Sequence, residues 1–210
     1  MIFKICGLKT KESLICCENN KVDFYGMIFY QKSPRNIPFN VAKELIIISK
    51  EFNIKPVGVF VDHNINELKE IIISLDLKYV QLHGNEKQSY IDELKKQFNL
   101  KIIKKISIKS SEDLGRINDY KNIDYILFDY KPKDNELPGG NSKSFDWNIL
   151  KDKKIDLPWF ISGGINENNI KNIQNLLNPN GIDLSSGVEE KIGIKSNIKI
   201  NSLFEKYYDN

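Results

Sequence analysis

Short runs of apolar and β-branched residues recur along the whole chain, and longer segments of mixed polarity separate them. Runs of this length and composition are typical of buried β-strands. Eight segments fit the description: Ile2 to Cys6, Val22 to Phe29, Pro56 to Val61, Tyr79 to His83, Ile102 to Ile106, Tyr125 to Asp129, Trp159 to Ser162, and Ile182 to Ser185. The pattern therefore predicts eight strands.

The segments between these strands carry signals of helix N-termini. They stand at Thr10 to Ser13, Asn64 to Glu67, Asn85 to Glu86 before Tyr90 to Phe98, and Asn166 to Asn169 before Ile170 to Leu177. Asn and Thr side chains accept hydrogen bonds from the free N–H groups of a first helical turn, and the helix dipole favours Glu there. A helix is therefore predicted in each gap.

Two of these helices are predicted against their local composition. Leu45 to Ile48 and Ile71 to Ile73 are so rich in isoleucine that propensity alone favours strands. Only the alternation of strands and helices along the whole chain makes them helical.

The spacing of the strands indicates the fold. Their starts lie roughly 20 to 35 residues apart with one helix in each gap, which is the pattern of repeated βα units. Eight such units predict an α/β protein, a single-domain (β/α)8 TIM barrel over residues 1–210. An open doubly wound sheet is the main alternative, but the Gly-x-Gly-x-x-Gly fingerprint of its dinucleotide-binding members is missing.

Composition narrows the class of protein. The net charge is +3 with 28% charged residues, and the lysines alternate with acidic residues, so we expect no nucleic-acid partner. Three cysteines, with Cys16 and Cys17 adjacent, make no disulfide framework and no zinc-ligand spacing, which favours a reducing cytoplasm. We expect Cys16 and Cys17 to pack as core filler at helical positions. No apolar stretch is long enough for a signal peptide or a membrane span.

Polar residues stand where the predicted strands end. These ends are Cys6-Gly7, Phe29-Tyr30, Asp62-His63, His83-Gly84, Ser107, Asp129, Ser162 to Gly164, and Ser185 to Gly187. In a barrel enzyme the carboxyl ends of the strands surround the active site. The sequence therefore predicts one ring of functional groups.

Two strand ends in this ring suit a phosphate group. Ser162 to Gly164 and Ser185 to Gly187 each place small residues and backbone N–H groups just before a predicted helix. Glycine lets the backbone approach an anion, and the loops after the last two strands are the usual phosphate site of this fold. The alternative is two ordinary tight turns, where Gly and Ser are common.

Cys6 and Asp129 are the candidate base and acid. A thiol at a strand end is a base or nucleophile if its pKa is lowered, whereas a buried Cys is more often a structural residue. Asp129 follows three apolar residues. Desolvation there would raise its pKa and keep it protonated as a general acid, although such a residue is often a helix cap or an ion-pair partner. Across one barrel mouth the two would form a base and acid pair.

Further candidates surround this pair. Arg35 could bind a substrate carboxylate with a bidentate fork, or it could be solvated. His83 could be an acid, a base or a hydrogen-bonded structural group, and His63 is expected to be exposed. The stretch from Tyr130 to Ser144 contains Pro132, Pro138 and the pair Gly139-Gly140. It is either a loop that closes over the mouth or a surface insertion.

Together these motifs resemble one family, phosphoribosylanthranilate isomerase, a (β/α)8 enzyme of tryptophan biosynthesis. The segments that carry the resemblance are Lys4 to Gly7, Gly26 to Tyr30, Lys32 to Arg35, Val57 to Val61, Val80 to Gly84, Phe128-Asp129, Gly139-Gly140, Phe145 to Trp147, Ser162 to Ile165, and Asp183 to Glu189. They run nearly from end to end. The loop departs from the family pattern, because Asn141 to Ser144 stand where threonine and glycine are usual.

The resemblance implies an Amadori rearrangement by general acid and base catalysis. Cys6 would be the base, Asp129 the acid, and Arg35 the partner of the anthranilate carboxylate. The phosphate would lie on Gly163, Gly164, Ser185, Ser186 and Gly187, and His83 and Asp183 could contact the substrate. The substrate would be a small phosphosugar, with neither metal nor organic cofactor, and the protein a cytoplasmic monomer or homodimer.

Two rival interpretations stay open. The related sugar isomerase of histidine biosynthesis performs the same rearrangement but is expected to carry an aspartate where Cys6 stands. A non-catalytic barrel that binds a phosphorylated ligand would also need the two phosphate loops. An assay of isomerase activity with the purified chain distinguishes this non-catalytic barrel from an enzyme.

Overall fold

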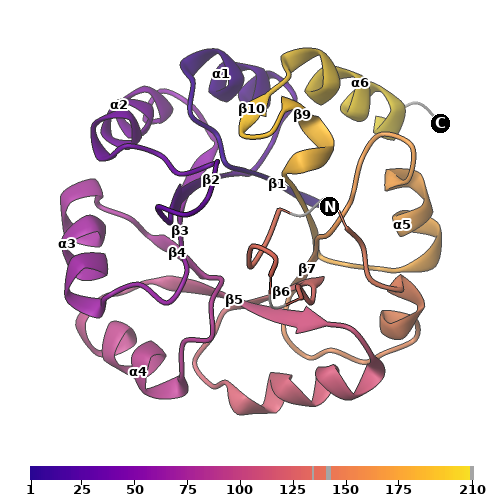
Figure 1. Cartoon of the computed structure of the whole chain (residues 1–210). Helices are drawn as coiled ribbons and strands as arrows, with labels where there is room; N and C mark the ends of the chain where they lie inside the picture. Colours follow the sequence, from indigo (N-terminus) through magenta and orange to yellow (C-terminus); the bar gives the residue numbers. More distant parts are fainter. Residues whose placement is uncertain (134, 141–142, 209–210) are drawn as a thin grey trace.

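Eight parallel strands close into one barrel in the computed structural model, which describes residues 1–133, 135–140 and 143–208 (Figure 1). Each strand pairs with the next along the chain, and β1 pairs with β8 to close the ring. The strands are β1 (Ile2–Cys6), β2 (Phe24–Phe29), β3 (Lys55–Phe60), β4 (Tyr79–Leu82), β5 (Lys101–Ile108), β6 (Tyr125–Tyr130), β7 (Trp159–Ile161) and β8 (Gly181–Leu184). The predicted TIM barrel is confirmed, and each predicted strand is present within a few residues of its expected bounds.

Helices surround the barrel as predicted, but in the described residues of two gaps, β5 to β6 and β6 to β7, the helices are 3-10 helices. The α-helices are α1 (Lys11–Asn19), α2 (Phe39–Ser49), α3 (Ile65–Leu75), α4 (Gln88–Gln97), α5 (Ile170–Leu176) and α6 (Asn197–Tyr208). The 3-10 helices are η1 (Ser111–Asp119), η2 (Trp147–Leu150) and η3 (Ser186–Val188). No residue of η1 is fully buried, although Leu114 and Ile117 pack against the core from one side.

The predicted N-caps are correct in part. Thr10 accepts a hydrogen bond from the Ser13 N–H, and Asn64 accepts from the first turn of α3. Asn85 is not a cap, because α4 begins after Lys87 and has no side-chain cap. The two isoleucine-rich segments are helical in α2 and α3, as the global alternation predicts.

Side chains of the strands alternate between two apolar layers. Phe3 and Ile5 of β1 point outward into the large core between the sheet and the helices, while Ile2 and Cys6 belong to the smaller cluster inside the barrel. Near the N-terminal ends of the strands the interior is filled by aromatic rings, among them Phe24 against Tyr79 with ring centroids 4.9 Å apart. Towards the carboxyl ends polar side chains such as Cys6, Gln81 and Asp129 stand beside apolar ones such as Ile28 and Val59, and this is where the pocket opens.

A short hairpin follows β8 and was not predicted. It consists of β9 (Glu189–Lys191) and β10 (Ile194–Lys195), which pair antiparallel between η3 and α6. Figure 1 shows it next to α1, outside the ring of barrel strands. Glu189 and Lys195 of this hairpin are nevertheless buried.

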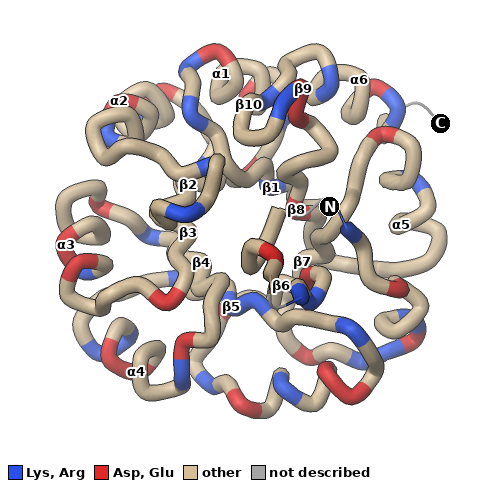
Figure 2. Tube along the Cα trace, viewed as in Figure 1, with Lys and Arg blue, Asp and Glu red and all other residues tan. Residues whose placement is uncertain are grey.

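Charges of both signs are interspersed around the ring of helices in Figure 2, as the sequence pattern predicts. Among the residues the structure describes, no helix is both long and apolar enough to cross a membrane.

Candidate active site

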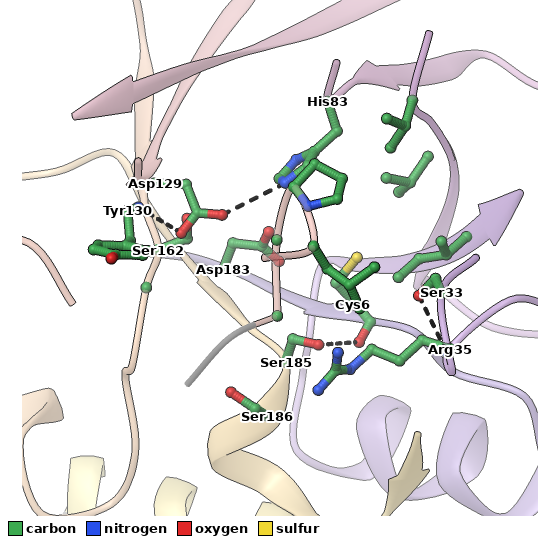
Figure 3. Close-up of a pocket in the computed structure, with 18 of the residues that line it drawn as sticks. Cys6, Ser33, Arg35, His83, Asp129, Tyr130, Ser162, Asp183, Ser185 and Ser186 are labelled. Atoms are coloured by element: carbon green, nitrogen blue, oxygen red, sulfur yellow. Dashed lines mark hydrogen bonds and ion pairs between the residues drawn. The ribbon is translucent and has the colours of Figure 1, made fainter. Parts of the chain in front are cut away.

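One pocket opens at the carboxyl ends of the barrel strands and holds about 830 Å³, counting the space at its open mouth. Nearly all of the predicted site residues line it. They are Cys6, Arg35, His83, Asp129, Gly163, Gly164, Asp183, Ser185 and Ser186. The predicted ring of functional groups is therefore confirmed in part, because Asp62, His63 and Ser107 do not line the pocket. Figure 3 shows the labelled side chains of the ring around the pocket.

Cys6 is the last residue of β1, and its thiol points into the pocket (Figure 3). A Cβ built at Gly26 of the neighbouring strand would lie 2.7 Å from the Cys6 Sγ, so the glycine makes room for the sulfur. Burial raises the pKa of the Cys6 thiol, and the nearby Lys4 and Lys195 ammonium groups oppose this only in part. The lowered pKa that a permanent thiolate would need is thus absent, and these surroundings favour the protonated thiol at Cys6.

Lys4 lies one inward position below Cys6 on β1 and is fully buried. Its Nζ is 2.9 Å from the Asp183 Oδ1 of β8. Burial by itself lowers the pKa of Lys4, but the charge of Asp183 and the hydrogen bond to it act against burial, and the pKa is raised. A permanent cation therefore stands beneath the thiol, where it stabilises a thiolate whenever one forms.

Asp129 near the end of β6 faces His83 across the pocket. Its Oδ2 is 3.5 Å from the His83 Nε2, and its Oδ1 accepts a hydrogen bond of 2.8 Å from the Tyr130 N–H. Burial raises the pKa of Asp129, but His83, Lys105 and the Tyr130 N–H together lower it below its ordinary value. The predicted raised pKa is therefore wrong, and these surroundings favour the carboxylate form of Asp129.

His83 is neutral in this arrangement. Burial and the charge of Lys105 lower its pKa, although Asp129 opposes them. The Gln81 Nε2 lies 2.9 Å from the His83 Nδ1 and donates to it, so the ring proton is on Nε2, which faces Asp129. His83 is thus a hydrogen-bond donor to the candidate acid, and Gln81, which sequence reasoning missed, orients it.

Lys105 was also missed. It is 6% exposed, and its Nζ lies 3.2 Å from the carbonyl oxygen of Pro138 in the loop after β6. The alternation of side chains along β5 places Ile103 inside the barrel, and so Lys105 as well. The alternation of side-chain direction along a strand is the sequence signal that could have identified Lys105.

Arg35 follows β2 and is buried, so the solvated alternative is wrong. Its side chain is 3% exposed, and its Nε and Nη2 donate to the two Glu189 carboxylate oxygens at 2.7 and 2.8 Å. Figure 3 shows its guanidinium close to Ser185, on the Cys6 side of the pocket. Neither Glu189 nor the hairpin that carries it was predicted to matter for the site.

The two predicted phosphate loops face each other at the mouth of the pocket. Gly163 and Gly164 have φ values of +92° and +68°, which only glycine adopts without strain. Gly187 does not line the pocket, and a Cβ built on it would lie 1.9 Å from the carbonyl oxygen of Ile165. Its absent side chain therefore lets the loops after β7 and β8 touch.

The serine hydroxyls at these strand ends are already engaged. Ser162 Oγ donates to the carbonyl of Phe128 at 2.9 Å, and Ser185 Oγ donates to the carbonyl of Cys6 at 3.1 Å. A phosphate in this part of the pocket would consequently be met by backbone N–H groups and by Ser186. This is the way glycine-rich loops hold phosphate.

The predicted loop from 130 to 144 lies over the middle of the barrel (Figure 1), with residues 134, 141 and 142 outside the described part. Leu137 to Gly140 line the pocket. A Cβ at Gly139 would be 2.4 Å from the His83 Nε2, and a Cβ at Gly140 would be 2.1 Å from the Arg35 Nη1. The loop therefore covers the pocket, and glycine is required where it crosses.

Comparison of the sequence with models of known protein families identifies the family of this chain. The family model described as N-(5'phosphoribosyl)anthranilate (PRA) isomerase matches residues 3–206. The chain belongs to this family. The isomerase of Rhizobium etli is 39% identical over 204 residues, covering 96% of this chain and 91% of the relative, and that of a Thermoanaerobacter species is 40% identical over 204 residues, covering 97% and 96%.

Solved structures of the family agree. The phosphoribosylanthranilate isomerase of Thermotoga maritima superposes with a TM-score of 0.87 at 27% identity, covering 98% of both chains. Another solved isomerase, in complex with reduced 1-(o-carboxyphenylamino)-1-deoxyribulose 5-phosphate, superposes with a TM-score of 0.82 at 26% identity and covers 98% of both chains. The histidine-biosynthesis alternative is thereby excluded, and the expected isomerase family is confirmed.

Residues outside the pocket have simpler roles in this isomerase fold. His63 is half-buried against Phe60, with ring centroids 5.4 Å apart, so the expected exposure is wrong. Cys16 and Cys17 are buried in the outer core, as predicted. In the described ranges no group of three or more His, Cys, Asp or Glu side chains is placed to hold a metal ion.

Proposed function

We propose that this chain isomerises N-(5′-phosphoribosyl)anthranilate to 1-(2-carboxyphenylamino)-1-deoxyribulose 5-phosphate, a step of tryptophan biosynthesis. The observation that carries the proposal is the convergence of Cys6 and Asp129 on one pocket, in a chain of this family. Arg35 lines the same pocket and suits the anthranilate carboxylate. The glycine and serine residues of the loops after β7 and β8 suit the phosphate.

The reaction needs one proton donor and one proton acceptor on the substrate's sugar. Asp129 donates a proton to the furanose ring oxygen, and the ring opens to a protonated imine. Cys6 then removes the proton from C2′, which leaves an enolamine that tautomerises to the product. The anthranilate nitrogen takes up the electron pair, so the substrate supplies its own electron sink.

Catalysis requires one proton to lie elsewhere than the protein surroundings alone favour. Those surroundings favour a thiol at Cys6 and a carboxylate at Asp129, whereas catalysis uses the thiolate and the carboxylic acid. The negative charges of the substrate raise the pKa of Asp129 and help to protonate it. Lys4 and Lys195 stabilise the thiolate that forms. His83 donates to Asp129 and keeps it aimed into the pocket.

We also propose the setting in which this activity takes place. It belongs to a single catalytic domain over residues 1–210, in the cytoplasm, that works as a monomer or a homodimer without a cofactor, nucleic acid or membrane. Three free cysteines support a reducing compartment. One solved relative is described as monomers generated from a dimeric isomerase of Thermotoga maritima.

The decisive experiment is an assay of the purified chain that follows the loss of phosphoribosylanthranilate fluorescence. We expect turnover by the wild-type protein and its loss in Cys6→Ala. A folded wild-type protein that binds the substrate without turnover would instead favour the non-catalytic binding barrel. A Cys16→Ala variant is the matched control, because Cys16 packs against α6 and away from the pocket.

A further inference from the structure

The hairpin after β8 places a buried carboxylate directly behind Arg35. Arg35 Nε donates to Glu189 Oε1 at 2.7 Å, and Arg35 Nη2 donates to Glu189 Oε2 at 2.8 Å. This is the bidentate geometry in which a carboxylate fixes the plane of a guanidinium. Because one edge of the guanidinium is occupied, the Nη1–Nη2 edge is the part that remains for a ligand.

A second cation completes this arrangement. The Lys195 Nζ lies 2.7 Å from Glu189 Oε1, 3.0 Å from the Ser185 carbonyl oxygen and 3.3 Å from the Ser185 Oγ. Three acceptors thus meet the three protons of an ammonium group. The buried cluster of Arg35, Glu189 and Lys195 then carries a net charge of one positive unit, which one substrate carboxylate would neutralise.

The ligand edge of Arg35 lies within the pocket. Gly140 of the covering loop packs against Arg35 Nη1, where a Cβ at position 140 would lie 2.1 Å away. Glycine at this point lets the loop approach the guanidinium closely, whereas any side chain would collide with Nη1. The hairpin and the loop therefore act on opposite edges of the same guanidinium.

We propose that Glu189, supported by Lys195, is a positioning residue that holds the Nη1–Nη2 edge of Arg35 towards the carboxylate of the substrate. The inference rests on the proposed function, because that function supplies the anthranilate carboxylate. Without Glu189, the long arginine side chain must be ordered by the ligand itself, which weakens binding roughly tenfold. The effect belongs to ligands that carry the carboxylate and to no others.

The test compares two stable product analogues. The first is reduced 1-(o-carboxyphenylamino)-1-deoxyribulose 5-phosphate, and the second is the same molecule without the carboxyl group. Calorimetry measures the affinity of wild type, Glu189→Gln and the matched control Glu190→Gln, which alters the exposed neighbour on the same strand. We expect Glu189→Gln to weaken the first ligand roughly tenfold and the second less than about twofold, with Glu190→Gln like wild type.

A double-mutant cycle separates positioning from general stability. In an Arg35→Gln background, Glu189→Gln should cause no further loss of affinity for the carboxylated ligand. Glu189→Asp keeps the charge that Arg35 and Lys195 require, and serves if Glu189→Gln does not fold; it should weaken the carboxylated ligand selectively but less. Equal losses for both ligands would overturn the inference, and so would a wild-type protein that does not discriminate between them.

The binding measurement is independent of turnover. Selective binding by a wild-type protein without isomerase activity would overturn the proposed function and still support the role of Glu189. If the wild-type protein is an active isomerase but Glu189→Gln binds the carboxylated ligand as selectively as wild type does, the proposed function is supported and the role of Glu189 is overturned. In active protein, Glu189→Gln should raise KM more than it lowers kcat.

Discussion

The two ends of strand β6 carry aspartates with opposite roles. Asp124, just before the strand, accepts a hydrogen bond of 2.9 Å from the Ile102 N–H and pairs with Lys95 and Lys101. Asp129, near the other end, faces the pocket and is met by His83 and the Tyr130 N–H. The surroundings lower the pKa of both carboxyls. The two residues therefore have the same type and charge. Only their surroundings decide that Asp124 joins strands and that Asp129 faces the pocket.

The arrangement at the N-terminal end recurs around the barrel. Asp23 accepts from the Phe3 N–H at 2.8 Å, and Asn180 accepts from the Trp159 N–H at 3.0 Å. Each residue precedes a strand and completes the hydrogen-bond ladder of the strand before it. This end of the barrel uses its polar side chains to join strands, whereas the carboxyl end directs them towards a ligand.

Adjacent lysines on β5 show the same contrast across the barrel wall. Lys104 points outward and is fully enclosed, with its Nζ 2.6 Å from Glu86 Oε2 and 2.9 Å from the Gly84 carbonyl oxygen. Lys105 points inward, and its Nζ donates to the carbonyl oxygen of Pro138 in the loop that covers the pocket. A change at Lys104 should therefore cost stability, and a change at Lys105 should alter the chemistry.

The largest expected effect is on turnover at the carboxyl end. Cys6→Ala and Asp129→Asn should each reduce kcat by about 100-fold or more, the usual scale for loss of a general acid or base. The free energy of unfolding should change by less than about 1 kcal/mol, because both side chains face the pocket and both substitutions keep the backbone hydrogen bonds of the strands. Steady-state kinetics and urea denaturation measure the two quantities. Normal turnover in folded Cys6→Ala would contradict the assignment of the base.

Lys104→Met should produce the largest loss of stability. Removing one partner of a buried ion pair leaves an uncompensated charge, here on Glu86, and costs about 3 to 5 kcal/mol. Urea denaturation measures this loss, and kcat per folded molecule should stay near that of wild type. The matched variant Lys105→Met should destabilise less and change kcat more. If Lys104→Met and Lys105→Met changed the free energy of unfolding and kcat equally, the proposed difference between the outer and inner faces of β5 would be contradicted.

Asp124→Asn should have a smaller effect of the same kind. The amide still accepts from the Ile102 N–H but loses its attraction to Lys95 and Lys101, so we expect a loss of about 1 kcal/mol in the free energy of unfolding. Turnover should be unchanged, since the residue lies at the far end of the strand from the pocket. A fall in kcat with unchanged stability would show that the two ends are coupled.

The smallest expected effect is in the acid dependence of stability. A carboxyl whose pKa is lowered by folding stabilises the protein above the pKa of the unfolded chain, about 3.9 for Asp, and this stabilisation is lost as the pH falls through the folded pKa. For Asp124, the loss therefore begins below about pH 4 to 5. Asp124→Asn should have a flatter profile of unfolding free energy in this range than wild type. If the unfolding free energies of wild type and Asp124→Asn fell in parallel as the pH is lowered, the stabilising role of the Asp124 carboxylate would be contradicted.

Much of the fold and most of the candidate site could be predicted. The strands could be found because buried parallel strands are apolar on both faces, and the ring of Cys6, His83 and Asp129 followed from their position at strand ends. Lys105 and Gln81 were missed because they lie within strands, where only the alternation of side chains shows that they point inward. The pKa directions were missed because they depend on groups from distant strands.

The sequence by itself determined the eight strands, their order, and the functional residues at their carboxyl ends, because hydrophobic patterning and chain order act locally and the barrel topology admits few alternatives. Only the tertiary structure decided the electrostatics of the pocket. It brought Asp183 beside Lys4, His83 opposite Asp129, and Glu189 behind Arg35. Arg35 and Glu189 are separated by 154 positions in the chain, and no local sequence pattern indicates that two such distant charges will form a buried ion pair.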